Sequence, residues 1–260
     1  MNNSDWLAYF RQNQLQRRGI AWHEGIHLAS RLQVPLARSL AAFQLGESSS
    51  GTRLLSAARE LGEKTSDPDY PRAIALFIAE EHEHSRLLAK SLELMNTPLL
   101  KKQWTDSLFR RCRHLLGFYE ELCVLLMAEI IALKYYGVIR QRCGARVLEV
   151  VCEQLLADEK FHVRFHCERL HGVISPFGSP IRAGFGAVLT VMFAVASTIV
   201  ACDHRQMFGA IGSSSTEFLR DSWLNFFAAR RAIFDGTPFA RDAADQIPGE
   251  TLPATPRHFA

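Results

Sequence analysis

Two short segments of the chain each place a glutamate and a histidine three residues apart. They are Glu81 and His84 in AEEHEHSRLL, and Glu159 and His162 in ADEKFH. Residues three positions apart lie on the same face of an α-helix. Both pairs fall on apolar stripes rather than on polar faces, and a buried charge is costly unless it is paired or binds a metal ion. The two pairs therefore indicate a shared cation site.

Two isolated carboxylates are placed to complete this site. Glu47 sits on the apolar stripe that contains Leu40, Phe43 and Leu54, and Glu129 lies within VLLMAEIIAL. In an antiparallel helical hairpin, residues at the same level are equidistant from the turn. The midpoint of 47 and 81 is residue 64, in a segment rich in turn formers, and the midpoint of 129 and 159 is Gly144. We therefore expect Glu47 to face Glu81, and Glu129 to face Glu159.

The elements that must position these residues are helices. Apolar residues recur with helical spacing along most of the chain, and alternating strand patterns with turn dipeptides are missing. The pattern predicts four long helices, then an apolar helix and an amphipathic one. Their expected ranges are 35–61, 71–95, 115–141, 146–171 with Gly172 as a C-cap, 181–209 and 214–235.

One Glu from each of two helices, with Glu-x-x-His from each of two others, is the ligand set of a dinuclear carboxylate site in a four-helix bundle. In this set the chain resembles the ferritin-like di-iron superfamily, in its oxygenase and oxidase branch. The resemblance implies an all-α fold with a ferritin-like four-helix bundle, a crossover connection and two extra C-terminal helices. The expected divisions are an N-terminal helical segment 1–34, the bundle 35–172, additional helices 173–240 and a flexible tail 241–260.

The resemblance also implies the chemistry of the site. The metal ligands would be Glu47, Glu81, His84, Glu129, Glu159 and His162, and they would hold two Fe ions, or Mn/Fe or Mn/Mn, with O₂ as the cosubstrate. Glu80 and Asp158, which directly precede the two Glu-x-x-His pairs, would hydrogen-bond to a ligand histidine. His166, one turn beyond His162, is either an additional ligand or supporting group, or a packed histidine.

The function that this chemistry favours is oxidation of a small organic substrate, with Phe43, Phe77 and Leu125 lining an apolar pocket. No catalytic residue beyond the metal ligands is identified. A ferroxidase or iron-binding protein is the first alternative, and a binding protein that kept the bundle is another. A zinc hydrolase is a further alternative, because His23, Glu24 and His27 form an HExxH pattern. That reading leaves both Glu-x-x-His pairs unexplained.

Composition limits the kinds of partner and the compartment that we expect for this protein. The 30 basic and 27 acidic residues nearly balance, and no basic run suggests nucleic-acid binding. A polar N-terminus and six cysteines without a CxxC pair favour a cytoplasmic protein. Residues 183–202 carry no charge over twenty positions, and we expect a buried or dimer-interface helix there rather than a membrane span. We expect a homodimer, and an electron-donor protein as a further partner.

Overall fold

The computed structural model describes residues 1–103 and 118–239, and none of these residues lies in a β-strand. The expected all-α class is therefore confirmed for this part of the chain. The helices in chain order are α1 (Asn3–Leu15), the short 3₁₀ turn η1 (Trp22–Glu24), α2 (Ser30–Glu47), α3 (Thr52–Thr65), α4 (Asp69–Leu94), α6 (Phe118–Arg142), α7 (Arg146–Ile174), α8 (Ser179–Asp203), α9 (Arg205–Ala210) and α10 (Ser215–Asp235).

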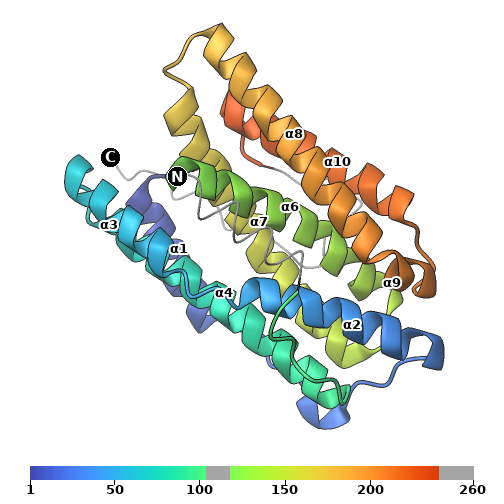
Figure 1. Cartoon of the computed structure of the whole chain (residues 1–260). Helices are drawn as coiled ribbons and strands as arrows, with labels where there is room; N and C mark the ends of the chain where they lie inside the picture. Colours follow the sequence, from blue (N-terminus) through green and yellow to red (C-terminus); the bar gives the residue numbers. More distant parts are fainter. Residues whose placement is uncertain (104–117, 240–260) are drawn as a thin grey trace.

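The long helices pack side by side around a common core. Helices α6 and α7 form the most extensively packed pair, and α4 packs against both α2 and α7. In Figure 1, α1, α3 and α4 lie on one side of α6 and α7, while α8 and α10 cover the other side. The two Glu-x-x-His segments are in α4 and α7, which pack against each other, so the buried His84 and His162 lie between these two helices.

Local sequence signals account for several helix ends. Asn2 and Asp5 form a reciprocal capping box at the start of α1. Ser214 caps α10 by accepting a hydrogen bond from the Glu217 amide, and Gly236 ends that helix with a positive φ of 70°. These caps satisfy backbone groups that helix ends otherwise leave unpaired.

The expected single helix over 35–61 is wrong. The structure divides this stretch into α2, which begins before Pro35, and α3, which begins after Gly51. The GESSSG sequence between them holds poor helix formers, and Gly51 adopts a φ of 64°, which a side chain would strain. The break makes Glu47 the last residue of α2, at the edge of the core rather than in mid-helix.

Two other expected boundaries are corrected. The apolar helix over 181–209 is interrupted at His204, so that α8 and α9 are separate. Gly172 lies inside α7, which continues to Ile174, and is not a C-cap. The expected start of the third long helix, the crossing before it and the flexible tail fall on residues 104–117 and 240–260, which are outside the described residues.

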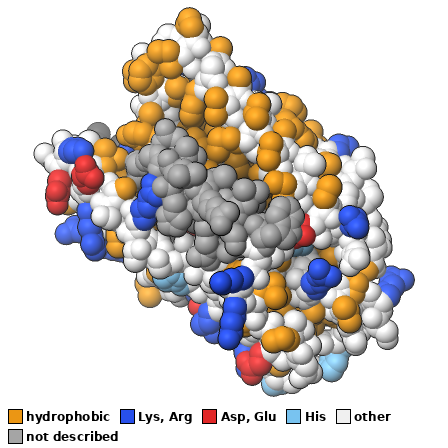
Figure 2. Space-filling model, viewed as in Figure 1, with side chains coloured by type: hydrophobic (Ala, Val, Ile, Leu, Met, Phe, Trp, Pro, Cys, Tyr) orange, Lys and Arg blue, Asp and Glu red, His pale blue; other side chains and the backbone are white. Residues whose placement is uncertain are grey.

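Within the described residues, two helices are long and apolar enough to cross a membrane: Glu121–Arg142 of α6, and α8. The α6 window is 83% buried, as in the core helix of a bundle, whereas the α8 window is 39% buried. One face of α8 packs against α6 and α10, and Val188, Val191 and Val195 are exposed on the other. Apolar side chains accordingly gather along α8 in Figure 2. The expectation of a buried helix thus holds for one face of α8, and a dimer through its other face stays a prediction.

Candidate metal centre

The two Glu-x-x-His pairs meet in the core. Glu81, His84, Glu159 and His162 each offer one ligand atom, and these four atoms all lie within 4.8 Å of one another. The contacts cross between α4 and α7: His162 Nδ1 is 3.1 Å from Glu81 Oε1, and His84 Nδ1 is 3.6 Å from Glu159 Oε1. This is the only such group of metal-ligating side chains among residues 1–103 and 118–239.

The four ligand atoms have the environment that a bound cation would require. His84 Nδ1, His162 Nδ1, Glu81 Oε1 and Glu159 Oε2 are all buried, and none has a hydrogen-bond partner. Buried polar atoms in native proteins are nearly always hydrogen-bonded, so four unpaired atoms directed at one point need an explanation. A metal ion held by these oxygen and imidazole nitrogen atoms would satisfy all four.

Glu47 and Glu129 lie beside this group without belonging to it. Both line a cavity that Glu81 and Glu159 also line. Glu47 Oε1 accepts a 2.8 Å hydrogen bond from the hydroxyl of Tyr136. The spacing argument therefore brought both residues to the correct region, although neither side chain joins the four clustered ligand atoms.

His166 contacts Glu129 rather than the cluster. His166 Nε2 is 3.0 Å from Glu129 Oε1, while His166 Nδ1 and Glu129 Oε2 have no hydrogen-bond partner. The contact fits the expected supporting position of His166. Whether it also binds a metal ion stays a prediction.

The outer carboxylates, Glu80 and Asp158, reach across to the histidine of the opposite helix. His162 Nε2 lies 2.9 Å from Glu80 Oε2, and His84 Nε2 lies 3.0 Å from Asp158 Oδ2. Because an ionised carboxylate can only accept, each imidazole must donate its Nε2–H. The lone pair that a neutral imidazole then keeps is on Nδ1, the atom that faces the cluster.

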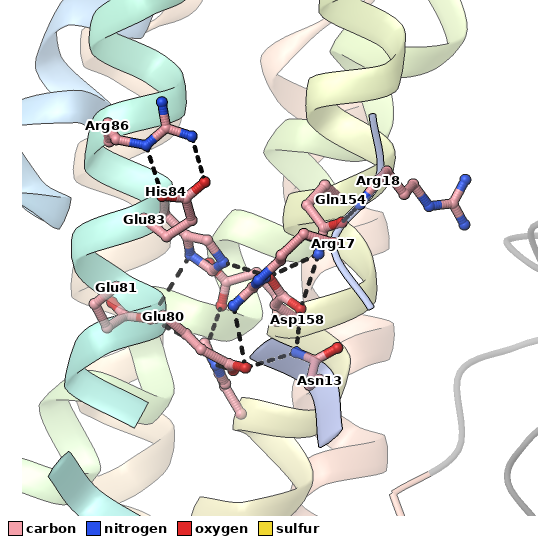
Figure 3. Close-up of polar contacts among 12 residues, drawn as sticks. Asn13, Arg17, Arg18, Glu80, Glu81, Glu83, His84, Arg86, Gln154 and Asp158 are labelled. Atoms are coloured by element: carbon pink, nitrogen blue, oxygen red, sulfur yellow. Dashed lines mark hydrogen bonds and ion pairs between the residues drawn. The ribbon is translucent and has the colours of Figure 1, made fainter. Parts of the chain in front are cut away.

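The N-terminal segment supplies a clamp for both outer carboxylates, formed by Asn13 and Arg17. The Asn13 amide donates to Glu80 Oε1 at 2.6 Å and to Asp158 Oδ1 at 2.7 Å. The Arg17 guanidinium lies 3.2 Å from Glu80 Oε1 and also binds Asp158. Figure 3 shows both side chains between α4 and α7, with Gln154 as a further donor to Asp158.

Burial and neighbouring charges shift the pKa of the clustered groups in opposite directions. Burial, with the charges of Glu81 and Glu159, raises the pKa of Glu47 well above its usual value. Burial likewise raises the pKa of Glu159 to about 7, although the nearby His162 opposes the change. The pKa of Glu81 falls to about 2, because its interactions with His162 and His84 outweigh the effect of burial.

The surrounding negative charge raises the pKa of both imidazoles. Burial would lower the pKa of His84, but Asp158, Glu159 and Glu81 together raise it to about 10. The pKa of His162 is also raised, since Glu159, Glu80 and Glu81 outweigh burial. A proton at each Nδ1 therefore stabilises the metal-free cluster, and a cation that takes its place must release that proton.

A largely apolar cavity of about 170 Å³ adjoins the four carboxylates. Phe43, Phe77 and Leu125 all line it, as expected from the sequence. Phe77 also contacts the imidazoles directly, with its ring edge-on to His162 at 4.7 Å and to His166 at 5.1 Å between centroids. Apolar side chains thus exclude water from one side of the cluster.

The alternative interpretation of His23, Glu24 and His27 as a helical HExxH zinc site is wrong. His23 and Glu24 belong to the 3₁₀ turn η1, and Gly25 follows with a φ of 68°, so the motif is not on one helical face. His23, Glu24 and His27 are exposed. A zinc site of this type needs both histidines on adjacent turns of a helix.

Sequence reasoning missed the partners that reach the cluster from a distance. Tyr136 lies in a strongly apolar segment that gave no sign of a polar contact, and Asn13 and Arg17 carried no periodic signal in a polar segment. Their carboxylate partners are 67 or more positions away in sequence. Comparison of the chain with protein-family models, curated proteins and solved structures gives no match.

Proposed function

We propose that this chain is a dinuclear carboxylate protein with a ferritin-like bundle, which uses O₂ to oxidise a small organic substrate. The observation that carries the proposal is the set of four unpaired, buried ligand atoms on α4 and α7. The carboxylates of Glu47 and Glu129, which line the adjoining cavity, provide the further oxygen ligands that a second ion needs.

The donor set fits a pair of hard or intermediate divalent cations. Carboxylate oxygens and neutral imidazoles favour iron or manganese over soft metals. Glu81 and Glu159 would hold the ions together with both histidines, because each carboxylate lies near the histidines of both helices. Two ferrous ions bound there would supply electrons to O₂.

The protein's own residues hold the ligands in place. Asp158 and Glu80 fix the orientation and the Nε2–H tautomer of His84 and His162. Tyr136 donates to Glu47 and so limits the directions in which that carboxylate can turn. The largely apolar cavity would hold a substrate beside the carboxylates.

A direct test compares Glu81→Gln with Glu83→Gln in iron-loaded protein. Glu83 is two residues away but binds Arg86 on the outside of α4. We expect wild type and Glu83→Gln to consume O₂ when a chemical reductant is supplied, and Glu81→Gln to lose most of this activity. Equal O₂ consumption by the two variants would contradict the proposal.

The ferroxidase alternative predicts a different outcome of the same assay. A ferroxidase consumes O₂ in proportion to the Fe²⁺ added, and it accumulates ferric mineral. An oxidase or oxygenase consumes O₂ in proportion to the reductant and the substrate, at constant bound iron. The largely apolar lining of the cavity beside the carboxylates favours the second outcome, because a path for iron ions would need a mainly polar lining.

A further inference from the structure

The cavity beside the carboxylates has a size that limits its occupant. Its volume of about 170 Å³ is close to the roughly 150 Å³ of an apolar cavity that holds benzene. Much of its described lining is apolar, including Phe43, Phe77, Leu125, Ala128, Ile131 and Val200. An occupant of this volume has one ring, or a short chain of similar bulk.

His204 also lines this cavity. His204 Nδ1 is 2.7 Å from the hydroxyl oxygen of Ser39. Ser39 and Glu47 both belong to α2 and are eight residues apart, which corresponds to about 12 Å along the helix. Phe43 lies between them in sequence, and its ring is 5.2 Å from the His204 ring. His204 therefore marks the end of the cavity remote from Glu47.

A hydrogen-bond chain fixes the tautomer of His204. The Ser39 hydroxyl lies 2.7 Å from the Tyr135 hydroxyl as well as from His204 Nδ1. Tyr135 is fully buried, and Ser39 is its hydrogen-bond partner. If Tyr135 donates to Ser39 and Ser39 donates to Nδ1, every hydroxyl hydrogen is satisfied. The reverse direction would leave the Tyr135 hydrogen buried without an acceptor, which is costly.

This direction leaves His204 Nε2 as a donor. Its nearest charged atom is Asp203 Oδ2, at 3.7 Å, which is beyond hydrogen-bonding distance. Burial lowers the pKa of His204 to about 4, against the effect of Asp203, so the imidazole is neutral at pH 7. A neutral N–H favours an uncharged acceptor such as a carbonyl, hydroxyl or ether oxygen.

We propose that the substrate is a small apolar molecule of about single-ring size, with one uncharged oxygen acceptor that binds His204 Nε2–H. His204 is then a specificity-determining residue: it holds the polar end of the substrate while the apolar end lies near Glu47 and Glu81. This inference rests on the proposed function for the reaction, but the binding itself depends on the cavity and not on bound metal.

The test uses two probes of equal shape on the full-length chain, both metal-free and metal-loaded. Acetophenone carries a carbonyl oxygen, and α-methylstyrene has a methylene group in its place. Calorimetric titration gives the ratio of their dissociation constants. We expect His204→Phe to shift this ratio against acetophenone by about five-fold, the equivalent of one ordinary hydrogen bond. His204→Gln, whose amide can still donate, keeps most of the wild-type ratio.

A cavity-filling variant identifies the place of binding. Ala128 exposes its side chain within the lining of the cavity, and Ala128→Phe should abolish binding of both probes. Unchanged binding in Ala128→Phe, or an unchanged ratio in His204→Phe, would overturn the proposal. Tighter binding of benzoate than of acetophenone would also overturn it, in favour of an anionic substrate. Metal binding without probe binding would refute this inference and leave the dinuclear centre standing.

Discussion

Replacing Arg17 by Met should destabilise the metal-free protein far more than the same change at Arg18. Arg17 is 22% exposed and pairs with Glu80 and Asp158, whose side chains are fully buried. At the 3.2 Å separation from Glu80, two unit charges attract by about 5 kcal/mol at an effective dielectric constant of 20. The cost of desolvating the arginine offsets part of this attraction.

The net loss in the free energy of unfolding depends on the contacts that the two carboxylates keep after the substitution. Removing one partner of a buried ion pair costs about 3–5 kcal/mol. Asn13 and the two histidines still bind both carboxylates, so we expect the lower end of this range, about 3 kcal/mol. For a chain of this size the melting temperature should fall by about 6–12 °C.

Urea unfolding of chelator-treated protein at pH 7 measures the effect, with Arg18→Met as the matched control. Arg18 is 41% exposed and pairs with Glu153 at the surface, so its loss should cost less than about 1 kcal/mol. If the two variants unfold within about 1 kcal/mol of each other, the clamp does not stabilise the outer carboxylates and the reasoning is refuted.

Two further predictions concern the backbone and the cavity. Gly51→Ala should destabilise the protein by about 2–4 kcal/mol, because φ is positive there and the new Cβ would lie 2.8 Å from Ile78. Gly172→Ala is the control: its Cβ would lie in open space inside α7, and it should stabilise the protein slightly in the same urea assay. The folded-state pKa of His204 is about 4, below its unfolded value, so stability should fall as the pH drops from about 6.5 to 4. His204→Gln should lower by about one the number of protons that the protein takes up on unfolding in this pH range. An unchanged pH dependence of the unfolding free energy would contradict a neutral, buried His204.

The local part of the centre could be predicted from the sequence because it depends on helical spacing alone. Glu81 and His84 share a helix face by their three-residue separation, and the same holds for Glu159 and His162. The equal sequence distance of Glu47 and Glu81 from residue 64 also predicted that Glu47 lies near Glu81, and both residues line the same cavity. These inferences need no knowledge of how distant segments pack.

The parts that could not be predicted depend on tertiary contacts. Asn13, in α1, and Arg17, just after that helix, reach the outer carboxylates from outside the expected bundle, and polar side chains in a polar segment give no signal of such a contact. The break between α2 and α3 has a local signal in the poor helix formers of GESSSG, but the close approach of Ile78 to Gly51 is visible only in the folded chain. The place of His204 in the cavity likewise depends on the packing of α2 against the segment that follows α8, which no local pattern shows.

The number of metal ions bound per chain tests the central claim most directly. Purified protein would be titrated with Fe²⁺ without oxygen, and bound iron would be measured after removal of free metal. We predict two ions per wild-type chain, and a clear loss for Glu129→Ala, whose carboxylate lies beside the cluster and lines the same cavity. Fewer than one ion per chain, with no change in Glu129→Ala, would contradict the dinuclear centre.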